Sequence, residues 1–367
     1  MGMAFLSGGI IYVDKYCFVI IESLNRAPYI KKYLEVINCK YDIVIWDRSA
    51  NSKNPGADKF YDMHYKDGQQ LSKIDKLFGY IKFSQFASKI LKQNDYKGIF
   101  VFTPNVGILC YHVLVNKYKN RFLLDIRDYW QEEHKAVYMI EKGLVKQSFA
   151  NIISSSAYKT FLPPADYIVT HNSQVMDKNT MHHFREKGLS ITGPITIACI
   201  GAIKRINYDK KVIDFFANDD RFFLKFIGKG YDQLKEYCEQ HNIFNVYTEG
   251  MFPMEETFNK YEGVDMILNM YGNHTPKLDY ALSNKLYFAA QLGRPIVVCN
   301  DTFMEKVATD NGFGIAVDLD DKRSKDRLFE YYNGLDYRKF LNSCDMFLNK
   351  VREDENNFVT VVKQFTE

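Results

Sequence analysis

Two glycines in the second half of the sequence are followed by basic side chains, in a pattern suited to binding a phosphate group. Gly201 comes directly after the apolar run Ile195–Ile200, and Lys204 and Arg205 follow it. A glycine lets a ligand approach the backbone closely, and Lys and Arg supply positive charge for a diphosphate. We therefore expect these residues to contact a phosphate-bearing ligand. Taken alone, the segment favours the alternative, an ordinary turn between a strand and a helix that carries solvated basic side chains.

Two further segments add candidates for the same ligand. Gly228 and Lys229 follow the next apolar run, in a second glycine-rich turn of the kind whose backbone N–H groups bind anions. Lys285 lies in the first turn of a predicted helix that Ser283 or Asn284 caps. A lysine in that turn opposes the helix dipole, so it is best explained if it faces an anion. A surface lysine without a ligand is the alternative.

Candidates for acid–base chemistry come from the first half of the sequence. Asp125 and Asp128 bracket Arg127 at the end of an apolar run, where a carboxylate that is catalytic or orients an acceptor is expected. A structural Asp–Arg pair is the alternative, because structural ion pairs also cluster charges. His171 ends a later apolar run and is a candidate for orienting a substrate, with a capping role as its alternative.

The side chains that bind metals are scattered. None of the seven cysteines forms a C-x-x-C pair, and the adjacent His182 and His183 face different ways on a helix. Asp318 and Asp320 form a D-x-D sequence, but in a solvated run of charges. We therefore predict no metal, no cofactor and no disulfide framework. Free cysteines in apolar runs indicate a reducing compartment.

The elements that position these residues read as alternating strands and helices. The predicted strands are mostly continuous apolar runs, which is typical of strands buried on both faces of a parallel sheet. They are Tyr16–Glu22, Asp42–Trp46, Gly98–Thr103, Arg121–Asp125, Asn151–Ser154, Tyr167–Thr170, Ile195–Ile200, Phe222–Ile227, Asn245–Thr248, Asp265–Leu268, Pro295–Cys299 and Gly314–Val317. The helical segments between them are Pro28–Asn38, Ile74–Lys92, Val106–Lys117, Val175–Lys187, Asp232–Gln240, Glu255–Tyr261 and Lys285–Leu292. This alternation predicts an α/β protein with right-handed βαβ units.

The length of 367 residues predicts two domains, because single cores stop growing near about 250–300 residues. The segment 190–194, which has Gly after a helix and Pro before a strand, places the boundary between residues 192 and 193. We expect a first domain over 1–192, a second domain over 193–345, and a C-terminal helix over 346–367 that packs back on the first domain. The helical pattern of this last part of the chain begins at residue 337. Residues 1–192 carry 26 Lys and Arg against 18 Asp and Glu, so this half of the chain prefers an anionic partner more than the second half does.

No apolar run approaches the roughly 18 residues that a membrane span needs. The apolar opening Met1–Val13 lacks a basic region and a cleavage site, so it does not resemble a signal peptide. The sequence therefore predicts a cytoplasmic protein.

Several segments, in order, resemble bacterial glycosyltransferases of the GT-B fold, closest to the family-4-like enzymes of capsule and exopolysaccharide assembly. Asn284–Tyr287 followed by Gly293–Val298 is similar to the nucleotide-sugar signature of that family. Leu124–Asp128 resembles its D-x-R-D segment, and Phe161–Asn172 resembles the segment before the crossing between domains. The spaced positions of the second domain are matched by Gly201, Gly228–Gly230, Gly250 and Asp265. The resemblance covers roughly residues 95–320. It implies two doubly wound, Rossmann-like parallel-sheet domains that face each other across a cleft and hold the ligand there. The domain over 1–192 would bind the acceptor, and the domain over 193–345 would bind the nucleotide-sugar.

The sequence departs from that family at three places. Many members carry a Glu-x7-Glu pair, whose second Glu bonds the nucleotide ribose. Its two positions correspond here to Tyr280 and Phe288, and Asp279, one residue before the first, is the candidate substitute. Ala202 replaces the usual Arg after the first glycine, which leaves Lys204 or Arg205 to contact the diphosphate. In the third departure, residues 23–28 stand where the family has an early glycine-rich loop.

The resemblance implies a glycosyltransferase that moves a sugar from a nucleotide-sugar to a saccharide or lipid-linked saccharide in cell-surface polysaccharide biosynthesis. The catalytic candidates are Asp128, His171 and Asp279; the donor-binding candidates are Gly201, Lys204, Arg205, Gly228, Lys229, Asn284 and Lys285. Two alternatives remain: a two-domain nucleotide-sugar epimerase, and a non-catalytic homologue that binds the nucleotide-sugar, which the missing Glu pair favours.

Two segments with mixed apolar and basic residues suggest a surface for an anionic membrane. Residues 77–92 carry aromatic and aliphatic side chains with lysines at helical spacing, and residues 28–40 add Lys31, Lys32 and Lys40. We predict reversible peripheral contact with the inner face of the plasma membrane, and no nucleic-acid partner. Ordinary amphipathic helices packed on the sheet are the alternative interpretation.

Overall fold

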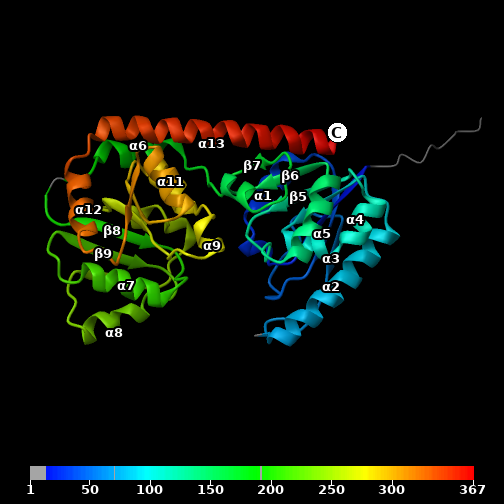
Figure 1. Ribbon diagram of the computed structural model, residues 1–367, viewed down its shortest axis with the longest axis horizontal. Helices are drawn as coiled ribbons and strands as arrows, with labels where there is room; N and C mark the ends of the chain where they lie inside the picture. Colours follow the sequence, from blue (N-terminus) through cyan, green and yellow to red (C-terminus); the bar gives the residue numbers. More distant parts are fainter. Residues whose placement is uncertain (1–13, 70, 191) are drawn as a thin grey trace, which may run out of the picture. The chain divides into compact units, whose positions relative to one another are not determined.

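The structure is a computed structural model that describes residues 14–69, 71–190 and 192–367. It divides into two compact units (Figure 1). Unit 1 contains the described residues up to Thr170 together with Asn356–Glu367, and unit 2 contains His171–Glu355. Each unit is a parallel β-sheet with helices on its faces, and none of the helices described is both long enough and apolar enough to cross a membrane.

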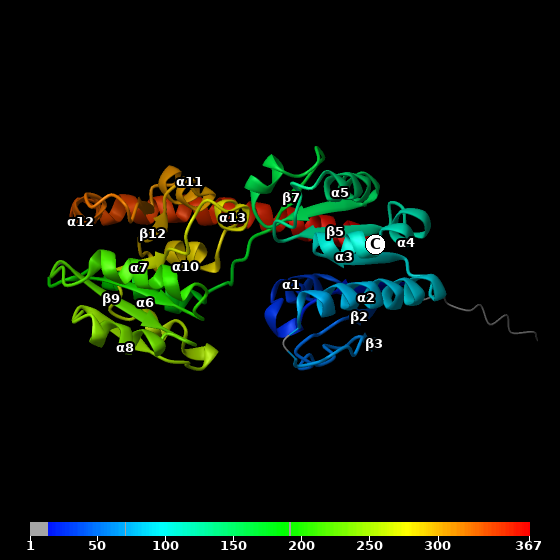
Figure 2. The ribbon, with the colours of Figure 1, turned by 60° about the horizontal axis from the view of Figure 1, so that its bottom comes forward.

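Unit 1 has a seven-stranded sheet in the order β3-β2-β1-β4-β5-β6-β7, with β3 and β7 at its two edges (Figure 2). The strands are β1 (Lys15–Ile20), β2 (Lys40–Ile45), β3 (Lys59–Asp62), β4 (Gly98–Phe102), β5 (Phe122–Ile126), β6 (Ala150–Ile153) and β7 (Ile168–Val169). Every described pair of neighbouring strands is parallel. Aromatic side chains fill the core; Phe18 stacks on Phe100 with ring centroids 4.5 Å apart.

The helical segments of unit 1 connect these strands. They are η1 (Leu24–Arg26), α1 (Tyr29–Val36), α2 (Lys73–Gln93), α3 (Pro104–Leu109), α4 (Tyr111–Lys117), α5 (Lys135–Gln147) and η2 (Ser156–Thr160). A capping box between Ser72 and Asp75 begins α2, which is the long helix between β3 and β4.

Unit 2 has a six-stranded parallel sheet in the order β10-β9-β8-β11-β12-β13. The strands are β8 (Ile195–Ile200), β9 (Phe222–Ile227), β10 (Val246–Glu249), β11 (Met266–Asn269), β12 (Ile296–Cys299) and β13 (Gly314–Val317). The helical segments are α6 (Lys178–Lys187), α7 (Ile206–Phe216), α8 (Gln233–Gln240), η3 (Met254–Glu256), η4 (Asn259–Tyr261), α9 (Pro276–Asp279), α10 (Asn284–Leu292), α11 (Phe303–Asp310) and α12 (Ser324–Asn333). The apolar core lies on both faces of this sheet.

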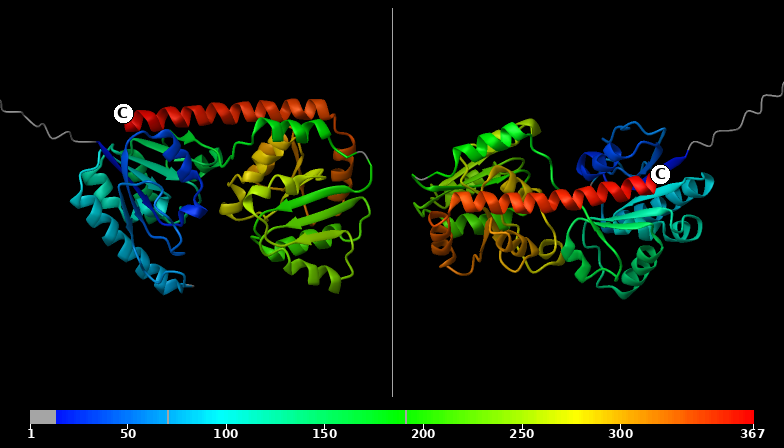
Figure 3. Two further views of the ribbon diagram at one scale, coloured as in Figure 1. Left: turned by 180° about the vertical axis from the view of Figure 1, so that it is seen from behind. Right: turned by 90° about the horizontal axis from the view of Figure 1, so that it is seen from above.

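The long helix α13 (Tyr337–Thr366) ends the chain. Its last turns lie against unit 1 (Figure 3). There Tyr16 donates a hydrogen bond to the backbone oxygen of Phe365 (3.1 Å), and Phe358 and Val362 are buried in the core. The helical pattern that the sequence shows from residue 337 onwards is confirmed, and the segment 346–367 is the later part of this one helix.

All twelve strands expected from sequence are present, within a residue or two at each end. The strand β3 was not predicted because it is short and lacks an apolar run: Lys59 is exposed and the other three residues are only partly buried at the sheet edge. The predicted helix over Glu255–Tyr261 is wrong: this segment forms the short 3-10 turns η3 and η4 instead. Pro253 fixes an extended backbone directly before it.

The boundary between the units differs from the one expected at 192/193, since it lies between Thr170 and His171. The helix α6 belongs to unit 2 because its apolar side is part of that unit's core, where Phe184 is buried. Arg185 also donates hydrogen bonds to the backbone oxygens of Ala290 (2.8 Å) and Gln291 (3.0 Å) in α10.

Candidate functional site

The carboxyl ends of β8 and β9 meet through two glycines. Gly201 and Gly228 have φ angles of +131° and +135°, in a region that favours glycine. A Cβ atom on Gly228 would overlap the carbonyl oxygen of Gly201, so the two turns pack backbone to backbone. Both glycines are therefore required by the local fold, independently of any ligand.

Lys285 is buried in the first turn of α10, with 8% of its surface exposed. Its Nζ atom donates a hydrogen bond to the Tyr271 hydroxyl (2.6 Å). The ammonium group also lies close to the end of β8, because a Cβ atom on Gly201 would be 3.7 Å from Nζ. Among the described residues no carboxylate forms a salt bridge with it. The surface-lysine interpretation is therefore wrong, and a buried ammonium without a paired carboxylate suits an anionic ligand.

Tyr271, just after β11, links Lys285 to the other predicted cations. Its ring centroid is 5.2 Å from Lys285 Nζ and 4.9 Å from Lys204 Nζ. Its backbone oxygen accepts a hydrogen bond from Arg205 Nη1 (3.1 Å). The structure thus brings Lys204, Arg205 and Lys285 together around one tyrosine, and we call these four residues the Tyr271 cluster. Sequence reasoning missed Tyr271 because one tyrosine among 26 carries no signal; its place directly after a strand was the available hint.

The Tyr271 cluster keeps its positive charge. Burial alone would lower the pKa of the Lys285 ammonium, but its interactions with Tyr271 and Cys199 raise it above the usual range. Burial raises the pKa of the Tyr271 hydroxyl, so that group stays neutral. Burial also raises the pKa of Asp209 to about 7, with the charge of Lys285 opposing part of that shift. Asp209 therefore cancels the Lys285 charge only in part at neutral pH.

A surface pocket of about 380 Å³ adjoins the cluster at the start of α7. It is lined by Lys204, Arg205, Ile206, Asn207, Tyr208 and Lys211. Three of these side chains are cationic, and the first turn of α7 adds the positive end of a helix dipole. This part of unit 2 is therefore suited to an anion such as a diphosphate.

The remaining candidates for binding the nucleotide-sugar donor, Lys229 and Asn284, lie near the Tyr271 cluster in the sequence but are not among the side chains that contact it. Lys229 is exposed, and within the described part of the chain its side chain makes no hydrogen bond or ion pair. Asn284 is half-buried as the first residue of α10, and Ser283, the N-cap by position, gives its hydroxyl to Asn269 Oδ1 (2.7 Å) instead of capping the helix.

Three hydrogen-bond partners hold His171 in place. Its Nδ1 lies 2.9 Å from the Tyr287 hydroxyl and its Nε2 lies 2.9 Å from Asp354 Oδ2. Its backbone N–H donates to Glu355 Oε1 (2.7 Å). Both ring nitrogens are therefore engaged within unit 2, which connects the start of that unit to α10 and α13.

Asp279 and Phe288 occupy the region of the Glu pair in the resembled family. Asp279 ends the short helix α9, and its Oδ1 atom is buried with no hydrogen-bond partner among the described residues. Phe288 is buried, and its ring packs edge-on against Phe258 (5.4 Å between centroids) and Tyr261 (6.3 Å). The position of the ribose-binding Glu is thus filled by an aromatic core side chain, which offers no hydrogen bond to a ribose.

In unit 1 the charges after β5 pair with each other. Arg127 donates two hydrogen bonds to Asp125, from Nε to Oδ1 (2.6 Å) and from Nη2 to Oδ2 (2.8 Å). The Tyr33 hydroxyl also donates to Asp125, and the Arg127 guanidinium lies 4.5 Å from the Tyr29 ring centroid. Both members of the pair are buried, which supports the structural interpretation. Asp128, the catalytic candidate, is exposed.

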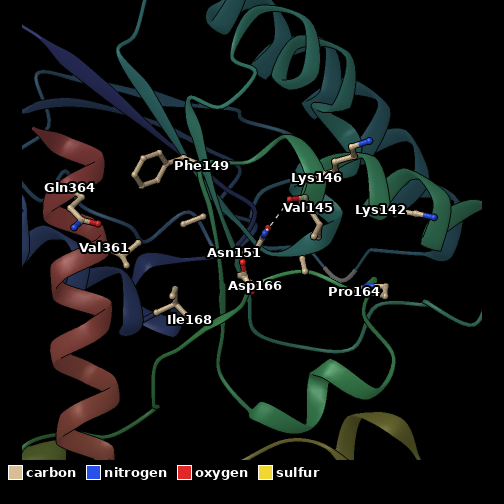
Figure 4. Close-up of a pocket in the computed structure, with 12 residues that line it drawn as sticks. Lys142, Val145, Lys146, Phe149, Asn151, Pro164, Asp166, Ile168, Val361 and Gln364 are labelled. Atoms are coloured by element: carbon tan, nitrogen blue, oxygen red, sulfur yellow. Dashed lines mark hydrogen bonds between the residues drawn. The ribbon is translucent and has the colours of Figure 1, made fainter.

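Unit 1 also contains a pocket of about 570 Å³, shown in Figure 4. It is lined by Lys142, Val145, Lys146, Phe149, Ala150, Asn151, Pro164, Ala165, Asp166, Ile168, Val361 and Gln364. The side-chain amide of Asn151 donates a hydrogen bond to the backbone oxygen of Val145 (3.1 Å). The pocket lies at the amino end of β6, whereas ligands of open parallel sheets bind beyond the carboxyl ends. We therefore assign it no part in the site. Within the described residues no group of three or more His, Cys, Asp or Glu side chains is placed to hold a metal ion.

Comparisons with known proteins identify the fold. No protein-family model and no curated protein matches the sequence. Among solved structures, sucrose-phosphate synthase from Thermosynechococcus elongatus matches with a TM-score of 0.67 at 10% identity, over 96% of this chain and 97% of that one. WaaG, a glycosyltransferase involved in lipopolysaccharide biosynthesis, matches with a TM-score of 0.64 at 9% identity, over 95% and 99%. HepE of Anabaena in complex with UDP matches with a TM-score of 0.63 at 10% identity, over 95% and 100%.

At such identities the likeness establishes architecture alone. The chain has the two Rossmann-like domains of the GT-B fold, as the sequence predicted, with parallel sheets of seven and six strands. A fold of this kind hosts more than one activity, so the activity has to be argued from the site.

Proposed function

We propose that this protein is a glycosyltransferase that moves a sugar from a nucleotide-sugar donor to a saccharide or lipid-linked saccharide acceptor in cell-surface polysaccharide biosynthesis. The observation that carries the proposal is the buried Lys285 ammonium, which is bound to Tyr271 beside Lys204 and Arg205 at the carboxyl ends of the unit 2 strands. The likeness to WaaG, and to HepE with UDP, supports the same class of donor and reaction.

In the proposed reaction the bond between the sugar carbon and the diphosphate oxygen breaks, and a bond from that carbon to an acceptor oxygen forms. The diphosphate leaves with extra negative charge, which the three cations of the Tyr271 cluster stabilise. The acceptor hydroxyl gives up its proton to a base, for which Asp128, His171 and Asp279 are the candidates. Three side-chain cations can neutralise the leaving group, so we propose a reaction without metal or cofactor.

Donor binding is the first test. In a thermal-shift screen against UDP-, GDP-, CMP- and TDP-sugars, we expect one nucleotide class to raise the melting temperature, because a ligand that binds only the native state stabilises it. Transfer is then measured with that donor, labelled in its sugar, and saccharide acceptors. If no nucleotide-sugar stabilises the protein, the donor assignment fails.

The two rival functions give different results in the same assays. An epimerase would convert the donor to its epimer in the absence of acceptor. A non-catalytic homologue would bind the donor tightly without turnover against any acceptor, and the aromatic side chain of Phe288 in place of a ribose-binding Glu is the observation that favours it. Transfer with no epimer formation is the result expected for the proposed enzyme.

A lipid-linked acceptor would lie at the inner face of the plasma membrane. We therefore propose a cytoplasmic protein with reversible peripheral contact at that membrane.

A further inference from the structure

The strand β10 forms one edge of the unit 2 sheet, and large apolar side chains surround it. Phe244, Tyr247 and Met251 have exposed fractions of 80%, 45% and 78%. The first lies just before the strand, the second within it and the third just after it. Scattered exposed apolar residues are ordinary, but a group of them along one open strand marks an interaction surface. We call these three residues the β10 edge patch.

The backbone of β10 has hydrogen-bonding groups on its outer side. The N–H group of Leu224 in β9 donates to the backbone oxygen of Asn245 (2.9 Å), and Leu224 is paired with Val246. In a parallel pair, alternate residues direct their N–H and C=O groups to the neighbouring strand. Those of Val246 and Thr248 therefore point away from β9, and no other segment of the described residues bonds to them.

The other edge strands of the two sheets are protected. Proteins guard such edges with very short strands or with charged side chains. In unit 1, β7 has only two residues and β3 carries Lys59 and Asp62 at its ends. In unit 2, none of the exposed large apolar side chains found in the described residues lies on β13. The edge at β10 thus differs from the other three, because it offers free backbone groups together with exposed apolar side chains.

The β10 edge patch is complementary to itself. When two copies of a strand pair antiparallel around a two-fold axis, the amino end of each meets the carboxyl end of the other. Phe244 of one copy then lies beside Met251 of the second copy, and the axis repeats this contact at the other end of the pair. A second copy of the chain therefore supplies both the backbone partner and an apolar side chain at each end.

We propose that the protein forms a two-fold dimer through β10, which joins the two unit 2 sheets into one continuous sheet. The outward backbone groups of Val246 in each copy exchange hydrogen bonds with those of Thr248 in the other. Tyr247 then lies on the axis opposite its counterpart, in a close pair without hydrogen bonds, and cross-strand aromatic pairs of this kind are stabilising. Glu249 is opposite Asn245 in this register, so like charges do not oppose each other.

The proposed interface is small, so the dimer should be weak. Aromatic side chains bury about 150–250 Å² each, so the exposed parts of the β10 edge patch in both copies, with the paired backbone, sum to on the order of 1,000 Å². Stable interfaces bury about 1,200–2,000 Å² in total, and transient ones bury less. We therefore expect a dissociation constant in the micromolar range. This proposal stands on the edge of unit 2 and does not depend on the proposed transfer reaction.

Sedimentation velocity of the full chain at a series of micromolar concentrations tests the proposal. We expect the parent protein to shift from monomer to dimer as its concentration rises. Phe244→Ser/Met251→Ser should weaken association by roughly tenfold or more, because it removes apolar contacts at both ends of the pair. The matched control is Val175→Ser/Met346→Ser, which changes two side chains of unit 2 that are 96% and 66% exposed. This control should associate as the parent does.

A proline variant tests the backbone pairing. Thr248→Pro removes an outward N–H group and leaves the bonds to β9 in place, because proline is tolerated on an edge strand where its N–H side faces solvent. The variant should sediment as a monomer at every concentration. Its melting temperature and its affinity for a nucleotide-sugar should match those of the parent, which separates failure to dimerise from failure to fold or to bind the donor. Thr248→Ala keeps the N–H group and should dimerise.

Cross-linking under mild oxidation tests the register. Tyr247→Cys should give a disulfide-linked dimer, because Cα atoms in a pair of this kind lie about 4.5 Å apart, within disulfide range. Glu249→Cys is the matched control: its two copies lie about four residues apart along the strands, roughly 13 Å, which is too far for a disulfide. The parent, whose native cysteines are all free, gives the background.

Three results would overturn the proposal. They are a parent that stays monomeric over the whole concentration range, a Thr248→Pro variant that still dimerises, and Glu249→Cys that cross-links as well as Tyr247→Cys. Capture of an added peptide strand by a monomeric parent would also overturn it, in favour of a different partner at the same edge.

Discussion

In unit 1 the charged side chains that follow a central strand pair with each other, whereas in unit 2 they surround a neutral tyrosine. Arg127 and Asp125 form a buried bidentate pair after β5. Lys285 is buried to a similar extent near the ends of β8 and β11, but it donates its hydrogen bond to the Tyr271 hydroxyl. The first arrangement is complete without a ligand, and the second leaves positive charge for one. A charged residue at a strand end therefore marks a site only when its charge is not already compensated.

Breaking the unit 1 pair should have the largest effect on stability. Arg127→Met leaves the Asp125 carboxylate buried without its partner, which costs about 3–5 kcal/mol in comparable pairs. Urea denaturation measures the loss. The control Asp128→Asn changes an exposed neighbour and should alter the free energy of unfolding by less than about 0.5 kcal/mol. A parent-like unfolding midpoint for Arg127→Met would remove the structural assignment of the pair.

Unit 1 also buries the carboxyl group of Glu141, which is mostly protonated at neutral pH. Neither side-chain oxygen of Glu141 has a hydrogen-bond partner among the described residues. Burial, with a smaller contribution from Glu132, raises the pKa of Glu141 from 4.5 to about 8. The native state keeps this proton where the unfolded state releases it, so the group's stabilising contribution is complete below pH 4.5 and is lost as the pH rises towards 8.

The variant Glu141→Gln should therefore remove a pH dependence of about 1.4 kcal/mol for each pH unit within that window. Chemical denaturation at a series of pH values measures it. Relative to the parent, the variant should gain stability as the pH approaches 8. If the two proteins keep a constant difference across the window, Glu141 is not protonated in the native state.

In unit 2 the comparison predicts an effect on ligand binding. Lys285→Met keeps the length of the side chain but removes the ammonium, and should weaken binding of the nucleoside diphosphate by about 1.5–3 kcal/mol. Isothermal calorimetry measures the affinity. Lys235→Met, at a lysine of α8 whose side chain is 73% exposed, is the matched control and should bind like the parent. If Lys285→Met binds within about twofold of the parent, the buried ammonium is structural like Arg127.

The smallest expected effect comes from the hydroxyl that links the cations. Tyr271→Phe keeps the ring between Lys204 and Lys285 but removes the acceptor of the Lys285 hydrogen bond, so donor binding should weaken by about 0.5–1.5 kcal/mol. Tyr271→Leu, which also removes the ring, should weaken it further. Tyr247→Phe, at an exposed tyrosine of β10, serves as control. Equal affinities for all three variants would leave Lys204 and Lys285 as independent side chains.

Local patterns in the sequence were enough to predict the strands of the two sheets, except for the edge strand β3. Continuous apolar runs such as Ile195–Ile200 are buried on both faces wherever they fall, so the strands and their parallel arrangement follow from composition and spacing. The same local logic found Gly201 and Lys285, because a glycine after a strand and a lysine in a first helical turn are both recognisable within a few residues. Their proximity in the fold follows from the carboxyl ends of parallel strands meeting at one edge.

Tertiary structure decided everything that depends on pairing across long distances in the chain. Tyr271 meets Lys285 because β11 and α10 adjoin. In unit 1, Tyr33 of α1 donates its hydroxyl hydrogen bond to Asp125, which lies 92 residues away in the chain. Neither partnership has a signature in sequence. The domain boundary moved for the same reason, since α6 packs its apolar side against unit 2. Helical spacing fixes which residues share a face of a helix but not what that face contacts. Only the packing therefore shows that the apolar face of α1 is buried, whereas α2 has one buried face and a second apolar face that is exposed.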